Sequence, residues 1–197
     1  GVVMMYAGYP ALDPGVRLSR LVPITWSGCC RIDEAALANA EPVAGFRIEM
    51  LAGRPVLRLR APEAAGLIDL ISGAEIGQVS RAQALAVADA YARALPYQAA
   101  LASRPAVKLL GLIDYDQWTV GDGADGAPLY HFSLGDRDGT ELYVCSASGA
   151  AMQLTIARER FWNWFGSVPH WLYFSQLRRR PLPWSRIVIW TSLLGCF

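Results

Sequence analysis

The fold is decided by residues 54–73, which read RPVLRLRAPEAAGLIDLISG. Apolar and charged residues alternate from Val56 to Arg60, and an apolar run follows from Leu67 to Ile71. Alternation with a period of two is typical of a β-strand. A proline opens the first run and a Ser-Gly pair follows the second, so the stretch predicts two antiparallel strands. Phe46 to Leu51 also alternates, and Ala52-Gly53-Arg54 predicts a turn between it and this pair, which gives a three-stranded meander.

The same pattern recurs at residues 127–149, which read APLYHFSLGDRDGTELYVCSASG. Pro128 again opens a strand, and the following strand again ends in a Ser-Gly turn, at Gly149. A helix is expected before each sheet. The first covers residues 34–41, and the second runs from Ser80 to about Leu95, where Ser80 and Gln83 match a capping box. Recurrence of this helix-plus-meander unit predicts an α+β fold with two tandem units.

We expect six segments along the chain. They are the end of a transmembrane helix at 1–9, a connector at 10–23, the first unit at 24–79, the second unit at 80–157, an amphipathic interfacial segment at 158–183, and the start of a transmembrane helix at 184–197. The strands of the second unit are expected at 108–113, 118–120, 129–134, 141–146 and 152–156.

The prediction of membrane segments depends on composition and on the two ends. Apolar residues make up 53% of the chain and charged residues 18%, against about 25% charged in an average soluble protein. Residues 1–8 and 187–197 carry no charge, and tyrosine, tryptophan and arginine flank them, as at the interface of a bilayer. The alternative is two ordinary core segments. The net charge of +1 gives no basis for a nucleic-acid partner.

The segment from 158 to 183 is rich in aromatic and basic residues, which favours a position among lipid headgroups. Its predicted interface residues are Trp162, Trp164, Trp171, Trp184, Arg178, Arg179 and Arg180. The alternative for the tryptophans is a protein core. The three arginines would bind lipid phosphate.

Residues 69–73 (DLISG) and 158–173 (RERFWNWFGSVPHWLY) resemble the PepSY domain and the PepSY-associated transmembrane proteins. In the turn of the first unit, Asp69 and Gly73 fit the pattern of the family. In the second unit Gly149 fits, but Cys145 occupies the acidic position. The resemblance implies a loop on the periplasmic side of a bacterial inner-membrane protein with several helices. It also implies a link to iron uptake, or to ferric-siderophore reductases that hold haem between membrane helices.

Candidate chemistry is sparse. His170 lies near the expected membrane helix and is a candidate haem or metal ligand, with a structural interfacial role as the alternative. Gly121 to Gly126 matches a nucleotide-binding glycine pattern, but a strand follows it, so we expect a hairpin loop. Asp136 to Glu141 predicts a solvated turn. Adjacent Cys29 and Cys30 are not expected to bond to each other, and Cys145 is expected to fill space in the core.

These patterns predict a non-catalytic sensing or interaction loop. No catalytic residue and no cofactor are assigned to this chain, although haem would belong to the whole protein in the reductase alternative. A further alternative is a module that regulates a protease. The expected partners are the lipid bilayer, the remaining transmembrane helices, and a periplasmic protein or ferric siderophore.

Overall fold

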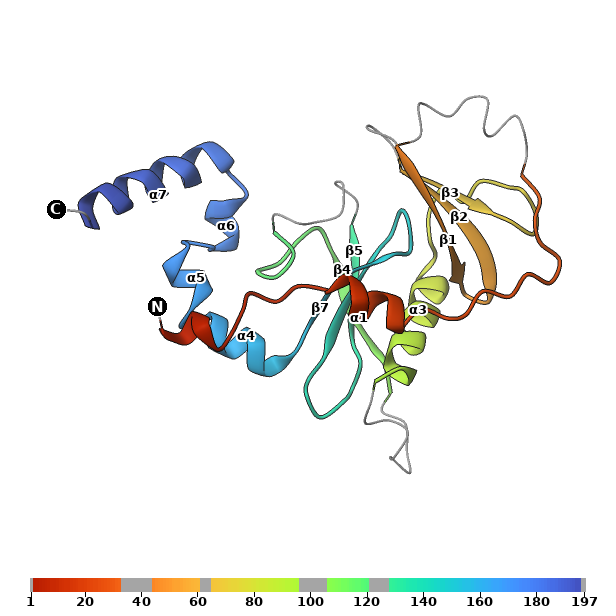
Figure 1. Ribbon diagram of the computed structural model, residues 1–197, viewed down its shortest axis with the longest axis horizontal. Coiled ribbons are helices and arrows are strands. Elements are labelled where there is room, and N and C mark those ends of the chain that lie inside the picture. Colours follow the sequence, from red (N-terminus) through yellow and green to blue (C-terminus); the bar gives the residue numbers. More distant parts are fainter. Residues whose placement is uncertain (1, 33–43, 61–64, 96–105, 121–127, 196–197) are drawn as a thin grey trace.

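The computed structural model describes residues 2–32, 44–60, 65–95, 106–120 and 128–195 (Figure 1). The helix expected at 34–41 and the glycine-rich loop at 121–126 lie outside these residues. The elements in chain order are η1 (Val2–Met5), α1 (Pro14–Ser19), β1 (Gly45–Leu51), β2 (Arg54–Arg60), β3 (Ala65–Asp69), α3 (Arg81–Arg93), β4 (Lys108–Ile113), β5 (Leu129–Ser133), β6 (Glu141–Cys145), β7 (Ala151–Thr155), α4 (Ala157–Asn163), α5 (Ser167–His170), α6 (Ser175–Arg178) and α7 (Pro181–Gly195). Two antiparallel sheets and several helices confirm the α+β prediction.

The first sheet has the order β1-β2-β3 and the second has the order β4-β5-β6-β7. A two-residue turn at Ala52 and Gly53 joins β1 to β2, and both residues have positive φ. That combination is typical of the type I′ turn, whose twist matches that of the strands. All neighbouring strands within the two sheets are antiparallel.

Each sheet contains a turn of the same kind, and the two turns are closed by equivalent backbone hydrogen bonds. Gly73 donates to the Asp69 carbonyl, and Gly149 donates to the Cys145 carbonyl, each at 2.7 Å. Just after each strand, Leu70 donates to the Pro55 carbonyl and Ser146 to the Pro128 carbonyl, each at about 3 Å. Both glycines have positive φ, at 80° and 64°, which explains the glycine at each position. Gly73 and Gly149 therefore close turns with the same backbone hydrogen bonds, in sheets of three and four strands.

Helix α3 lies between the two sheets (Figure 1). Its Ser80 side chain accepts from the Gln83 amide, and Gln83 reaches back to the Ser80 amide, so the predicted capping box is present. One core cluster combines α3 with residues of both sheets. Its buried members are Leu51, Val56, Leu67, Val79, Ala84, Ala88, Tyr91, Ala92, Leu95, Phe132, Leu134, Leu142, Val144 and Ala151. The helix is thus the shared core of the two sheets.

The connector holds a helix that was not predicted, and the strand predicted at residues 118–120 was wrong. The connector at 10–23 contains the short helix α1, because the Asp13 side chain accepts from the Gly15 and Val16 amides and Pro14 occupies the first turn. Residues 118–120 form a turn and not a strand. There the Asp116 side chain accepts from the Trp118 and Thr119 amides and so takes the donors that a strand would use.

The segment at 158–183 is not one helix but the series α4, α5, α6 and the start of α7. Gly166 lies in the break between α4 and α5, and Leu172, with a positive φ of 53°, lies in the break between α5 and α6. Helix α7 has 15 residues. Within the described residues, no helix combines the length and the apolar character needed to cross a bilayer. The two ends of the described chain lie on the same side of the molecule (Figure 1).

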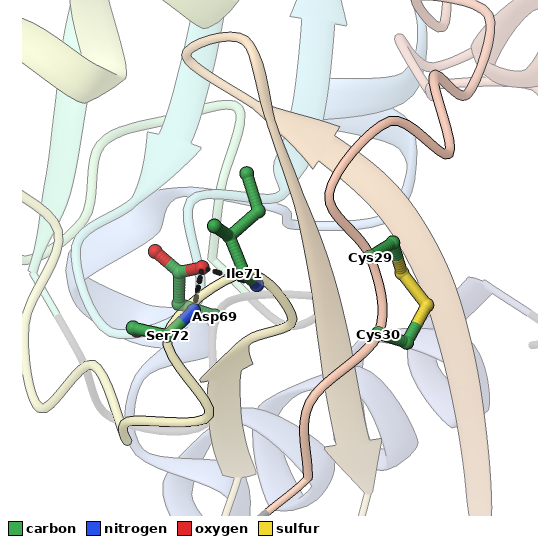
Figure 2. The surroundings of a disulfide bond; sticks show 5 residues. All are labelled: Cys29, Cys30, Asp69, Ile71 and Ser72. Atoms are coloured by element: carbon green, nitrogen blue, oxygen red, sulfur yellow. Dashed lines mark hydrogen bonds between the residues drawn. A yellow bond between two sulfur atoms is a disulfide. The ribbon is translucent and has the colours of Figure 1, made fainter.

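Cys29 and Cys30 form a disulfide, so the expectation that these neighbours would not bond was wrong (Figure 2). That expectation assumed a trans peptide bond, whereas the bond between them is cis. The adjacent Arg31 amide donates to the Leu70 carbonyl at 2.7 Å and attaches this segment to the end of β3. Cys145 is a free, buried cysteine that packs in the second sheet, as expected.

We expect Gly149→Ala to destabilise the protein more than Gly53→Ala does. Both changes place a side chain at positive φ, which costs about 1 kcal/mol. At Gly149 the new Cβ would also lie 2.9 Å from Leu51 Cδ1 and 3.2 Å from Val79 Cγ2, whereas at Gly53 it meets no atom within 4 Å. Overpacking should add about 1–3 kcal/mol at Gly149. Urea unfolding followed by tryptophan fluorescence measures the difference, and equal losses would contradict the packing role of Gly149.

Candidate functional site

The first and last described segments pack together at one end of the molecule. The Asn163 side-chain amide in α4 donates to the Gly8 carbonyl at 2.9 Å. A Cβ on Gly166 would lie 3.1 Å from Val3 Cγ1, so the turn after α4 touches η1 closely. Between η1 and α4 lies a pocket of about 560 Å³, lined by Val2, Val3, Tyr6, Ala7, Gly8, Ile156, Arg158, Glu159 and Trp162. Residues of η1 and of α4 with the turn after it therefore build one surface.

Large apolar side chains are exposed across this end, which we call the aromatic surface. Its members are Val2, Met5, Tyr6, Phe161, Trp162, Trp164, Phe165, Trp171, Phe174, Leu182, Ile187, Ile189, Trp190, Leu193 and Leu194. Trp162, Trp164 and Trp171 are 44–50% exposed. Helix α7 has no buried residue. An apolar area of this kind is unusual for the surface of a soluble monomer.

The predicted interface tryptophans lie on consecutive elements of this end. Trp164 makes an edge contact with buried Trp118, with ring centroids 6.2 Å apart. Trp184 is half-buried, and its indole donates to the Trp171 carbonyl at 3.4 Å. The tryptophan side chains therefore combine an exposed apolar face with anchoring contacts to the fold.

The three predicted interface arginines do not behave alike. The Arg178 guanidinium lies 4.1 Å from the centre of the Tyr173 ring, and that of Arg179 lies 3.8 Å from the centre of the Tyr115 ring. Arg179 Nη1 also donates to the Tyr115 hydroxyl at 2.5 Å. Such cation–π contacts hold two of the three arginines against the protein. Arg180 is exposed.

His170 is exposed at the same end, with its ring edge-on to Trp171 at 5.3 Å. In the described part of the chain, no group of three or more His, Cys, Asp and Glu side chains is placed to hold a metal ion. The structure thus shows an accessible imidazole without companion ligands among the described residues.

The Asp69 turn is held by its carboxylate (Figure 2). Asp69 Oδ1 accepts from the Ile71 and Ser72 amides at 2.8 and 3.2 Å, and Oδ2 accepts from Arg54 Nε at 2.5 Å. Burial acts to raise the pKa of Asp69, but the hydrogen bonds from Arg54 and the two amides hold that pKa below its ordinary value. The turn therefore has a structural ion pair, which Cys145 cannot form at the matching place.

A second polar cluster on β5 and β6 was missed from the sequence. The His131 ring bonds to Glu141 Oε2 at 2.9 Å, and Arg160 Nη2 lies 3.0 Å from Glu141 Oε1. The Tyr143 hydroxyl donates to Asp116 Oδ2 at 2.6 Å. His131 and Glu141 share a face because β5 and β6 pair with His131 opposite Tyr143. Once the register of β5 and β6 is known, the alternation of side chains along the strands places His131, Glu141 and Tyr143 on one face.

The polar side chains of this cluster bind one another. Burial acts to raise the pKa of Glu141, but His131 and Arg160 lower it overall, whereas burial raises the pKa of Tyr143. Both carboxylate oxygens of Glu141 have partners, and Arg160 also donates to the Gly139 carbonyl at 2.9 Å. The arrangement fastens α4 to the second sheet.

We expect Asp69→Ala to lower the free energy of unfolding by about 1 kcal/mol at neutral pH, because two backbone amides lose their acceptor. Asp69→Asn should cost less, since its amide oxygen can still accept from them. The folded pKa of Asp69 is depressed, so its charge stabilises the protein above the unfolded value of about 4 and loses this effect as pH falls through the folded value. The gap between wild type and Asp69→Asn should thus close in acid. A gap that persists there would contradict a role of the charge.

Compared with protein-family models, with curated proteins and with solved structures, the chain matches none.

Proposed function

We propose that this chain is a non-catalytic sensing or interaction loop on the periplasmic side of a bacterial inner-membrane protein, with a link to iron uptake. The observation that carries the proposal is the aromatic surface, which both ends of the described chain share. A loop that leaves and re-enters the same face of a bilayer must present both ends to that face. The partners of this surface are the lipid bilayer and the remaining helices of the same protein.

The composition of the aromatic surface supports a lipid interface. Tryptophan and tyrosine are enriched where a bilayer meets water, and this end exposes Trp162, Trp171 and Trp190 together with Tyr6. Helix α7 exposes leucine and isoleucine side chains along its length, and its 15 residues carry one charge, at Arg186. We propose that residues 1–9 and 184–197 are the inner ends of two transmembrane helices.

We propose that the matching turns belong to two tandem PepSY-like units. Beyond the turn itself, Ile68 forms a bridge with Glu75 in the first unit, and Val144 pairs with Ala151 in the second. The chain after each turn therefore folds back onto the strand before it. The Arg54–Asp69 pair is present in the first unit alone, because Ala127 and Cys145 take the matching positions in the second.

The non-catalytic role is supported by the polar cluster beside β5 and β6, because its carboxylates are already bound by neighbouring side chains and amides. Asp116 accepts from Tyr143 and from the Trp118 and Thr119 amides, and Glu141 is bound by His131 and Arg160. These carboxylates stabilise turns and strand pairs. A general acid or base would need access to a substrate proton.

The exposure of His170 at the aromatic surface favours a second candidate, the loop of a haem-containing ferric-siderophore reductase. One imidazole fits one axial position of a haem iron. The other histidine, His131, is bound to Glu141 in the second sheet, so a second histidine ligand would come from outside this chain.

The lipid interface is tested with vesicles and the full chain. We expect the double variant Trp162→Ser/Trp190→Ser to bind phospholipid vesicles at least about tenfold more weakly than wild type, because two large apolar side chains leave the interface. Tryptophan fluorescence during lipid titration measures the affinity.

Trp26→Ser is the matched control. Trp26 is 55% exposed, and its carbonyl accepts from the Cys29 amide beside the first sheet, away from the aromatic surface. Its loss should leave vesicle binding unchanged. Equal weakening by both variants, or no vesicle binding by wild type, would overturn the proposal.

The haem candidate is tested by titrating haem into the vesicle-bound chain. We expect a shift of the Soret band that is lost in His170→Ala and kept in His131→Asn, because only His170 is exposed at the surface that faces the lipid. A shift that depends on neither histidine would remove the reductase candidate.

A further inference from the structure

Charged side chains occupy a buried face of the first sheet, beside α3. Strand alternation places Arg58 on the same face as Val56, which is fully buried in the core around α3. Glu49 lies opposite Val56 in the β1–β2 register and shares this face. Arg58 and Glu49 are each 6% exposed, and Arg58 Nε donates to Glu49 Oε2 at 2.9 Å. A buried ion pair therefore stands where an apolar contact would be expected.

Positive charge exceeds negative charge around this pair. Arg17 of α1 donates to Glu49 Oε1, and Arg47 Nε lies 3.8 Å from the same oxygen. Burial acts to raise the pKa of Glu49, but Arg58 and Arg17 lower it overall. One carboxylate thus faces three guanidinium groups. Arg47 is largely exposed to solvent, whereas Arg17 and Arg58 are buried or nearly so and share the single Glu49 carboxylate. Two such arginines on one carboxylate leave room for a further anion, because taking unpaired charge out of water costs several kcal/mol.

Three buried donors of this region have no partner among the described residues. They are Arg58 Nη1, Arg20 Nη1 and the Tyr91 hydroxyl. Tyr91 is 2% exposed and belongs to α3. Tyr91 belongs to the same core cluster as Val56, which shares a face of β2 with Arg58. Arg20 directly follows α1, whose Arg17 is bound to Glu49 beside Arg58. Burial raises the pKa of Tyr91. An unmet buried donor costs about 1–3 kcal/mol.

We propose that Arg20, Arg58 and Tyr91 bind a small phosphate-type oxyanion at the junction of α1, α3 and the first sheet. Guanidinium groups match the oxygen spacing of phosphate and donate along two directions, and the phenol supplies one further donor. Phosphate carries about two negative charges at neutral pH, which suits a site with several arginines and one glutamate better than a single carboxylate does.

Helix α1 is the cover of this site. It has no buried residue, and its Arg17 is bound to Glu49 across the junction. Displacement of so short and exposed a helix would open the site to an ion. Bound phosphate should therefore hold α1 in place and protect the peptide bonds after Arg17 and Arg20 from trypsin.

The inference is independent of the membrane proposal, because α1, α3 and β2, which carry or adjoin these groups, lie away from α4 to α7 (Figure 1). A failure to bind vesicles would leave it intact. A failure to bind phosphate would likewise leave the lipid interface intact.

The test is calorimetry of the full chain with inorganic phosphate at constant ionic strength, with succinate as the dicarboxylate arm and chloride as the background anion. We expect saturable phosphate binding that Tyr91→Phe and Arg20→Gln each weaken about tenfold, which corresponds to one hydrogen bond of about 1.4 kcal/mol. Tyr91→Phe keeps the aromatic packing of α3, so its fold should be retained. Arg93→Gln, an exposed arginine on the same helix, is the control and should bind as wild type does.

Limited trypsin digestion gives a second readout. Phosphate should slow cleavage after Arg17 and Arg20 in wild type and in Arg93→Gln, and Tyr91→Phe should need about tenfold more phosphate for the same protection. Tighter binding of succinate than of phosphate, equal weakening by Arg93→Gln and Tyr91→Phe, or the absence of saturable phosphate binding would each overturn the proposal.

Discussion

The burial of α3 between two sheets is the constraint on which the rest of this structure depends. Ala84, Ala88 and Ala92 leave little bulk on the helix, so both sheets can approach it closely. The same core includes Leu51 from the first sheet and Val79 before the helix, and both contact the turn at Gly149. Each sheet also has a smaller buried cluster of its own on its other face. The helix and the Gly149 turn therefore join them into one folded unit.

Strand positions were predictable because the alternation of side chains is a local property. β4 was found at its predicted bounds, and β2, β5, β6 and β7 differ from theirs by one or two residues. Helix α1 and the turn at residues 118–120, which the sequence patterns did not predict, share one cause. Asp13 and Asp116 use their side chains to bind backbone amides, and these bonds created α1 and removed the expected strand at 118–120. Such bonds depend on short-range geometry that apolar periodicity does not report.

The two regions of functional interest differ in how far the sequence reveals them. Clustered tryptophans are visible in the sequence, and the structure exposes Trp162, Trp164 and Trp171 as a lipid interface would require. Arg17, Arg20, Arg47 and Arg58, which lie around or beside Glu49, form a second region, the arginine cluster. This cluster cannot be recognised from the sequence in the same way. In β2, Leu57 and Leu59 suggest that their face is the buried one and that the Arg58 face points to solvent. The structure covers both faces. The segment that contains Cys29 packs on the Leu57 face, and α1 and α3 pack on the Arg58 face. A sheet covered on both sides defeats the assumption that arginine marks the solvent side.

The path of the N-terminal segment keeps the aromatic surface and the arginine cluster independent. Between η1 and α1, three consecutive residues are tied to the second half of the chain. The Gly8 carbonyl accepts from Asn163, the Tyr9 hydroxyl donates to the Gln117 carbonyl, and the Pro10 carbonyl accepts from Gln153 at 2.8 Å. A displacement of α1 would have to break these bonds before it could move η1. Because Pro10 and Gln153 are buried, breaking their bond would leave unmet polar groups in the interior, at a cost of about 1–3 kcal/mol. Movement at the arginine cluster would therefore end at Pro10, so this segment does not couple the arginine cluster to the aromatic surface.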